Sequence, residues 1–129
     1  NRICLIYENQ GDRVITDAKW LSALLEQIIS NAVKYTKNGK VKISFDREKN
    51  RLVISDSGIG IRSEDIPKIF DKGYSGFNGR LNQKSSGIGL YMVKKIAHKL
   101  SITIDVESEV GKGSSFFIYF NELHRKNGV

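Results

Sequence analysis

Residues 85–95 read SSGIGLYMVKK, and residues 56–61 read DSGIGI. The tripeptide Gly-Ile-Gly therefore occurs twice in this chain. The first copy follows a β-branched apolar run that predicts a strand, whereas the second opens a stretch whose apolar residues have helical spacing. The two copies of an internal repeat would stand in the same structural context. We therefore interpret the two stretches as different parts of one site rather than as a duplication.

Length, composition and charge indicate one domain that binds an anion. The 129 residues can bury a core without disulfides, and the single cysteine, Cys4, has no partner for an internal one. The net charge of +7 favours nucleic acid, a nucleoside triphosphate or an acidic protein surface. The basic residues are dispersed, and neither zinc-ligand spacing nor an RNA-binding motif is present, which argues against nucleic acid.

The parent protein is expected to be longer than this chain. Because the first residue is Asn rather than Met, we expect residues 1–129 to be a single domain excised from a longer protein. No apolar run is long enough to cross a bilayer, although a membrane anchor could lie elsewhere in the parent.

The periodicity of the apolar residues predicts a two-layer α/β sandwich with a mixed, mostly antiparallel sheet. Helices are expected from a cap at Thr16 or Asp17 to about Thr36, at 63–69 and at 87–100. Gly39 is expected to terminate the first helix. Residues 71–86 are polar and glycine-rich without a period, which predicts a long functional loop. The predicted strands lie at 2–7, 13–16, 40–46, 51–56, 101–108 and 114–120.

The first helix is expected to carry two stripes. Its apolar stripe, which would face the core, consists of Leu21, Leu25, Ile28 and Ala32. Its polar stripe consists of Gln27, Asn31, Lys34 and Tyr35. Asn is a poor helix former, and its amide oxygen is a ligand that suits Mg²⁺. A solvated polar face would explain the same stripe without a ligand.

Three further stretches carry chemistry that fits a nucleotide. Gly87 and Gly89 at a helix start would bring backbone N–H groups and the helix dipole to a phosphate. Asp56 at a strand end can accept a hydrogen bond from an exocyclic amine such as that of adenine. The hydroxyl of Ser114, after the turn 111–113, could reach the base. Tight helix packing, a simple turn and a plain hairpin are the respective alternatives.

Taken together and in order, these stretches resemble the ATP-binding domain of bacterial sensor histidine kinases, which shares the Bergerat ATP fold with gyrase and MutL. The resemblance covers nearly the whole chain. Within the family, IFDKGYSGFNGR at 69–80 is most similar to the intramembrane-sensing kinases of antimicrobial-peptide responses. The matching motifs are the N box at 27–36, the glycine boxes at 56–61, 86–90 and 111–114, and the F box at 69–73.

The resemblance implies a role for each site residue. Asn31 would hold Mg²⁺, with Gln27 near the ion or its waters, and Lys34 and Lys72 would meet the phosphates. Residues 71–86 would form a mobile ATP lid. The residues implied to bind the nucleoside or line its pocket are Tyr35, Asp56, Gly58, Gly60, Ile61 and Ser114, and those at the lid hinge and phosphate cradle are Gly87, Gly89 and Leu90.

Position 27 separates phosphotransfer from hydrolysis. Hydrolytic members of the family place a Glu there, whereas Gln27 carries an amide that cannot act as a general base. The resemblance therefore implies a histidine protein kinase domain that donates the γ-phosphate of Mg-ATP to a histidine on a separate dimerisation domain of the same polypeptide, with a response regulator downstream. The fragment would lie in the cytoplasm, tied to the membrane only through its parent.

Two other functions remain open at this point. One is an ATPase switch of the gyrase or MutL type, in which the nucleotide drives a conformational change. The other is a basic binding module without enzymatic activity, which would need exposed aromatic side chains among its basic residues. Phe45, Phe116 and Phe120 look like core positions instead.

Overall fold

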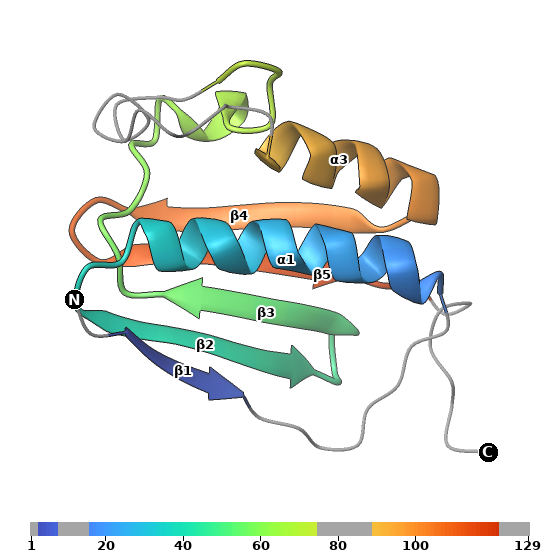
Figure 1. Ribbon diagram of the computed structural model, residues 1–129, viewed down its shortest axis with the longest axis horizontal. Helices are drawn as coiled ribbons and strands as arrows, with labels where there is room; N and C mark the ends of the chain where they lie inside the picture. Colours follow the sequence, from blue (N-terminus) through green and yellow to red (C-terminus); the bar gives the residue numbers. More distant parts are fainter. Residues whose placement is uncertain (1–2, 8–15, 75–88, 122–129) are drawn as a thin grey trace.

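The computed structural model describes residues 3–7, 16–74 and 89–121 of the chain, and within them one five-stranded sheet is covered by helices (Figure 1). The elements are β1 (Ile3–Tyr7), α1 (Ala18–Lys34), β2 (Gly39–Asp46), β3 (Arg51–Asp56), the 3-10 turn η1 (Ile66–Lys68), α3 (Gly89–Leu100), β4 (Thr103–Glu109) and β5 (Gly113–Tyr119). In this part of the chain no helix is both long and apolar enough to cross a bilayer.

The sheet is mixed and mostly antiparallel, as the sequence predicted. Its strand order is β1-β2-β3-β5-β4, with β1 parallel to β2 and every other neighbouring pair antiparallel. Both α1 and α3 lie against the same face of the sheet (Figure 1). The predicted two-layer sandwich is therefore confirmed, and both hairpins, 39–56 and 103–119, close within it.

Helix α1 begins and ends through local chemistry. The Oδ1 atom of Asp17 accepts hydrogen bonds from the backbone N–H groups of Lys19 at 3.0 Å and Trp20 at 3.2 Å, so Asp17 rather than Thr16 is the N-cap. The helix ends at Lys34, and Tyr35 is its C-cap. Gly39 was expected to terminate this helix, which is wrong, because Gly39 is already the first residue of β2.

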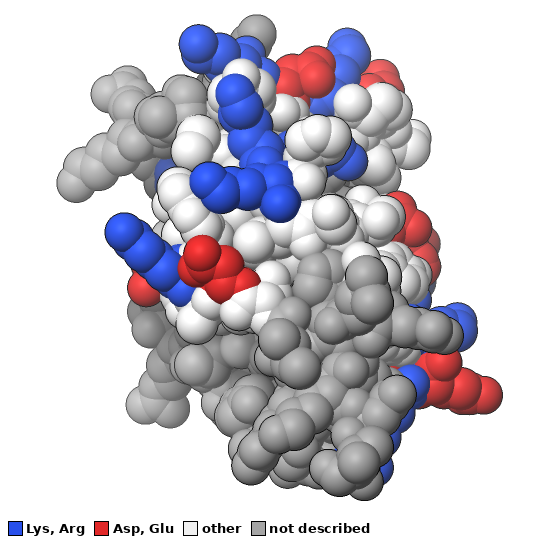
Figure 2. Space-filling model, turned by 90° about the vertical axis from the view of Figure 1, so that its right-hand side faces the viewer, with Lys and Arg blue, Asp and Glu red and all other residues white. Residues whose placement is uncertain are grey.

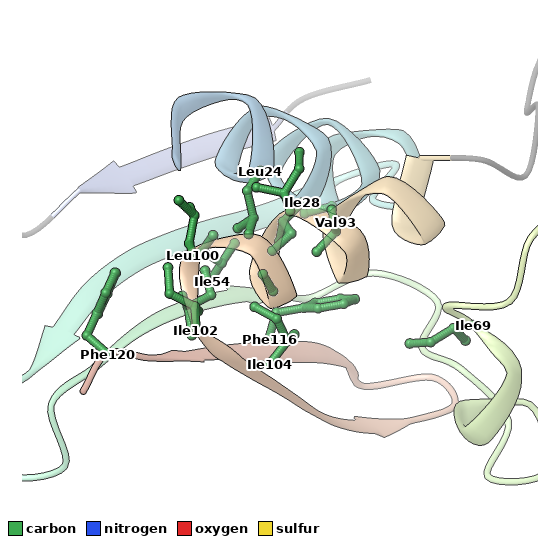
Figure 3. Close-up of a cluster of buried hydrophobic side chains, with 14 of the residues drawn as sticks. Leu24, Ile28, Ile54, Ile69, Val93, Leu100, Ile102, Ile104, Phe116 and Phe120 are labelled. Carbon is green, nitrogen blue, oxygen red and sulfur yellow. The ribbon is translucent and has the colours of Figure 1, made fainter. Parts of the chain in front are cut away.

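The core lies between the two helices and the sheet (Figure 3). Leu24 and Ile28 of α1 and Val93 of α3 meet Ile54 and Phe116 of the sheet, and each is at most 1% exposed. The predicted apolar stripe of α1 was partly wrong, because Leu24, which it left out, is fully buried. Leu21 and Leu25, which it contained, are only partly buried. The helix packs against α3 as well as the sheet, and this second contact covers a side of α1 that a one-sided stripe leaves to solvent.

The remaining differences concern turns and boundaries. The helix expected at 63–69 is only the short 3-10 turn η1, in which the Lys68 N–H donates to the Asp65 carbonyl at 2.8 Å. Pro67 has no N–H and cannot extend an α-helical ladder there. The last two strands are shifted by one or two residues. The expected strand at 13–16, except Thr16, most of the loop 71–86, and Gly87 lie outside the described residues.

Helix α3 ends in a motif that favours glycine but contains serine. Ser101 has a φ of 57°, its N–H donates to the His98 carbonyl at 3.2 Å, and the Ile102 N–H donates to the Ala97 carbonyl at 2.8 Å. This is the Schellman arrangement, whose left-handed residue is usually Gly. Ser101 is exposed, so its side chain contributes little packing in return.

We predict that Ser101→Gly stabilises the domain by about 0.5–1 kcal/mol, because glycine adopts a positive φ without the steric cost of a Cβ atom. Thermal unfolding of the two chains at equal concentration measures the effect. Ser101→Ala is the control, since it keeps the Cβ atom and should give no gain. A melting temperature for Ser101→Gly at or below that of the Ala variant would contradict the prediction.

Candidate functional site

The carboxylate of Asp56 is held at the end of β3 by two backbone donors. Its Oδ1 atom accepts hydrogen bonds from the N–H groups of Gly58 at 2.9 Å and Ser114 at 3.3 Å. Burial raises the pKa of Asp56 above its ordinary value of 3.8, and the two hydrogen bonds lower it by less. Both bonds end on Oδ1, so no donor among the described residues is seen on the second carboxylate oxygen, which could accept a hydrogen bond from a ligand.

The turn after Asp56 is built against two neighbouring segments. The Ile59 N–H donates to the Tyr35 carbonyl at 3.2 Å, which joins the turn to the end of α1. Gly60 has a φ of 79°, and a Cβ atom there would collide with the carbonyl oxygen of Glu109. Only glycine allows this approach without strain. The turn therefore lies between α1 and the β4–β5 hairpin, with Asp56 at its base.

A hydroxyl pair fixes the other side of this turn. Ser108 Oγ accepts a hydrogen bond from the Ile61 N–H at 2.7 Å and lies 2.7 Å from Ser114 Oγ. Ser108 also donates to the Gly113 carbonyl at 3.0 Å, so Ser114 is the donor in the hydroxyl pair. Ser114 is 8% exposed, and its N–H donates a hydrogen bond to Asp56. Ile61, Ser114 and Asp56 thus belong to one hydrogen-bonded unit.

The polar stripe of α1 lies along the same side of the fold. Gln27 and Lys34 are exposed, whereas Asn31 and Tyr35 are partly buried. The Asn31 carbonyl accepts the Tyr35 N–H at 3.2 Å, and Lys34 Nζ lies 5.7 Å from the centre of the Tyr35 ring. From Gln27 to Tyr35 the helix rises about 12 Å, at roughly 1.5 Å per residue. The stripe ends beside Gly58, next to Asp56.

The opposite end of the stripe meets the start of α3. A Cβ atom on Gly89 would lie 2.8 Å from Gln27 Oε1, so the side chain of Gln27 faces the first residue of α3. Leu90 packs against the core beside it. Lys72 Nζ lies 6.0 Å from the ring centre of Tyr91, in the first turn of the same helix. Gln27, Gly89 and Lys72 therefore gather at one helix N-terminus.

The structure brings most of the predicted site residues into two groups joined by α1. The first group surrounds the end of β3 and consists of Tyr35, Asp56, Gly58, Gly60, Ile61 and Ser114. The second surrounds the start of α3 and consists of Gln27, Lys72, Gly89 and Leu90. Asn31 lies on α1 between the groups, and Lys34 stacks near Tyr35. Gly87 lies outside the described residues.

Two residues in this region were not predicted as site residues. Ser108 stands opposite Ser114 in the β4–β5 register, and counting outward from the turn 110–113 would have paired them. Thr36 is 3% exposed, and its hydroxyl has no hydrogen-bond partner among the described residues. A Cβ atom on Gly58 would lie 2.8 Å from that hydroxyl. No periodicity signals such a contact, because Thr36 lies just beyond the helix.

The donor set around a metal ion would differ from that of a transition-metal site. Within residues 3–7, 16–74 and 89–121, no group of three or more His, Cys, Asp and Glu side chains could hold a metal ion. Asn31 offers an amide oxygen and Gln27 a second one a helical turn earlier. Hard neutral oxygens with several waters fit Mg²⁺ bound together with phosphates.

Comparison with known proteins agrees with this geometry. Residues 16–124 match the family described as histidine kinase-, DNA gyrase B-, and HSP90-like ATPases. Sensor protein BceS of Bacillus subtilis is 43% identical over 113 residues, which are 86% of this chain and 34% of BceS. Sensor histidine kinase GraS of Staphylococcus epidermidis is 38% identical over 110 residues, 84% of this chain and 32% of GraS.

Solved structures show the same fold. The mycobacterial sensor histidine kinase MprB superposes with a TM-score of 0.77 at 22% identity, covering 90% of this chain and 79% of that one. The chain therefore belongs to the family of histidine kinase-, DNA gyrase B-, and HSP90-like ATPases. The resemblance to sensor histidine kinases is confirmed, and BceS and GraS agree with the predicted subgroup. The chain spans about a third of the length of these relatives.

The raised pKa of Asp56 predicts a dependence of stability on pH. Because the folded-state pKa lies above 3.8, this group contributes stability that is fully present below about pH 3.8 and is lost as pH rises through the folded-state pKa. Above that pKa the ionised carboxylate lowers stability by a constant amount. Asp56→Asn keeps an acceptor for Gly58 and Ser114 but carries no charge.

We therefore expect Asp56→Asn to melt a few degrees above the wild type at pH 7, and the difference to shrink as pH falls toward 4. Thermal unfolding across this range measures it. Asp105→Asn, on the exposed side of β4, is the control and should show no comparable gain. A variant that is less stable at pH 7, or a gain that grows on acidification, would contradict the assignment.

Proposed function

We propose that the domain binds Mg-ATP across α1 and donates its γ-phosphate to a histidine on another domain of a longer sensor kinase. One observation carries the proposal. The polar stripe of α1 extends from the half-buried carboxylate of Asp56 to the start of α3 at Gly89. The base would lie at Asp56, and the phosphates at Gly89 and Lys72. A ligand that fills both ends must be elongated, with a hydrogen-bond donor at one end and negative charge at the other.

The chemistry at each end supports an adenine nucleotide. A carboxylate accepts a hydrogen bond from the exocyclic amine of adenine, and a guanine ring in the same orientation would present a carbonyl oxygen, which is an acceptor, at that position. The first turn of a helix has N–H groups without partners inside the helix, and at the start of α3 these groups and the positive end of the helix dipole would face phosphate oxygens. Asn31 lies between the two ends, where its amide oxygen would hold Mg²⁺. When bound there, the ion would supply positive charge beside the phosphates.

The acceptor and the downstream partner would both lie outside this chain. The relatives named above are sensor kinases more than twice as long as this chain, so the phosphoacceptor histidine would be supplied by a dimerisation domain of the same polypeptide. A response regulator would then receive the phosphoryl group. The chain itself would lie in the cytoplasm, with the parent anchored in the membrane.

The structure argues against a nucleic-acid-binding module despite the basic surface (Figure 2). The aromatic rings near the lysines of α3 are covered by those lysines: Lys99 Nζ lies 4.4 Å from the Trp20 ring centre, and Lys95 Nζ lies 5.4 Å from that of Tyr91. Bases need free ring faces for stacking. Phe116 is 1% exposed and lies in the core, as the sequence predicted.

Nucleotide binding is tested by thermal unfolding with Mg-AMPPNP. The wild type should gain stability with ligand concentration, because a ligand that binds only the folded state stabilises it by mass action, by about 2.7 kcal/mol at one hundred times the dissociation constant. Asp56→Asn should lose this gain while remaining folded. The two assignments would fail if that variant bound the nucleotide as tightly as the wild type, or if guanosine triphosphate stabilised the wild type equally.

The residue at position 27 distinguishes the kinase hypothesis from the ATPase-switch hypothesis. An amide at the phosphate end cannot deprotonate water, so the isolated chain should hydrolyse ATP very slowly. Gln27→Glu places a carboxylate opposite Gly89 and should raise hydrolysis by about tenfold or more. Phosphate release measured on both chains tests this, with Gln27→Asn as the control that keeps an amide. Rapid hydrolysis by the wild type would favour the ATPase switch.

A further inference from the structure

Residues 62–74, between the Asp56 turn and the start of the undescribed residues, contain an acidic group that the proposed chemistry does not use. Asp65 is 9% exposed, and its Oδ2 atom accepts a hydrogen bond from Arg62 Nε at 2.9 Å. The Arg62 side chain is about half exposed, and its Nε atom also lies 3.5 Å from Glu64 Oε1. Buried carboxylates normally require such a partner, because removing their charge from water is costly.

Tyr74 is the second partner of Asp65. Burial raises the pKa of the Tyr74 hydroxyl above 10.0, and the charge of Asp65 and a side-chain hydrogen bond to it raise this pKa further. The Tyr74 ring packs against the core. Gly73, with a φ of 83°, turns the chain immediately before this ring.

The chain between Asp65 and Tyr74 is fixed along its length. Ile69 is 3% exposed, and the Phe70 ring meets the Phe116 ring edge-on at a centroid distance of 6.4 Å. The Asp71 N–H donates to the Lys68 carbonyl at 2.9 Å, and the Tyr74 N–H to the Asp71 carbonyl at 3.1 Å. The contact between Asp65 and Tyr74 therefore joins the two ends of a segment whose central residues, Ile69 and Phe70, are anchored in the core.

Lys72 lies inside this closed loop. Its side chain is exposed and extends toward the first turn of α3, where Nζ is 6.0 Å from the Tyr91 ring centre. Within the described residues, the structure shows no ion pair to this ammonium group. Its position is instead set by the backbone of residues 71–73, and the bonds of Tyr74 on one side and the burial of Ile69 on the other hold that backbone.

We propose that Asp65 and Tyr74 form a clasp that positions Lys72 for the phosphates of the bound nucleotide. The inference rests on the proposed function, since it specifies how the phosphate end of that site is aligned. Asp65 and Tyr74 are positioning residues: neither touches the ligand, and both act through the backbone that carries Lys72. Arg62 orients the Asp65 carboxylate through the bond from its Nε to Oδ2.

Stability alone is a poor reason for such a clasp. Replacing a buried ionic or hydrogen-bonded group by apolar side chains of similar volume is often neutral or stabilising. Ile69 and Phe70 already anchor the segment through the core. Apolar packing does not fix the orientation of the turn at residues 71–73. The directional hydrogen bond between Tyr74 and Asp65 does. A lysine needs that orientation to meet a phosphate reproducibly, because its flexible stem does not provide it.

The test compares two ligands on the same chain by titration calorimetry. Adenosine reports on the base end, and Mg-AMPPNP reports on the base and phosphate ends together. Tyr74→Phe keeps the ring and removes the hydroxyl, and it should weaken Mg-AMPPNP binding by about five- to tenfold while adenosine binding stays unchanged. Lys72→Met should do the same. The double variant should lose no more than the larger single loss, because both changes remove one interaction.

Asp65→Asn provides a second variant that keeps the shape of the side chain and should show the same selective loss. Tyr119→Phe is the matched control, because its hydroxyl accepts a hydrogen bond from Arg51 at 2.9 Å away from the site. A Tyr74→Phe variant with an unchanged ratio of the two affinities, or with both affinities reduced alike and a lower melting temperature, would show a purely structural role. A wild type that binds neither ligand overturns the proposed function, and the clasp with it.

Discussion

The packing of α1 against α3 on one face of the sheet sets the dimensions of the whole site. Leu24 and Ile28 on one helix and Val93 on the other are fully buried. Because these side chains fix the two helices relative to each other, Gln27 faces Gly89. The same helix α1 reaches the Asp56 turn through the Tyr35 carbonyl. The separation of the two ends of the site is therefore a property of the core and not of the loops.

Asp56 illustrates the conflict between stability and binding. A carboxylate at a strand end, partly removed from water, destabilises the folded chain when it is ionised, as its raised pKa indicates. The N–H groups of Gly58 and Ser114 compensate only in part, since both bond to the same oxygen. The second carboxylate oxygen would complete the compensation if it accepted a hydrogen bond. Under the proposed function, a ligand amine at this oxygen would offset the cost of burying the charge.

Much of the site could be predicted from the sequence because it depends on regular spacing. The polar stripe of α1 follows from helical periodicity, and Asp56 follows from its place after an alternating strand. Contacts made by turns could not be predicted in this way. The bond of Ser108 to the Ile61 N–H, the orphan hydroxyl of Thr36 and the contact of Asp65 with Tyr74 depend on how separate turns meet in space. Gly39 was misassigned for the same reason.

Under the proposed function, the distribution of charge would also set the direction of the bound nucleotide. The end of the site at β3 carries the carboxylate of Asp56, whereas the end at α3 offers a helix N-terminus and the ammonium group of Lys72. A triphosphate in the reverse direction would place its negative charge beside a half-buried carboxylate and forgo both positive groups. Under the proposed function, electrostatics therefore disfavours that orientation before any contact with the base is considered. Because an amide at position 27 cannot activate water, this end of the site would serve to align the γ-phosphate toward an incoming acceptor.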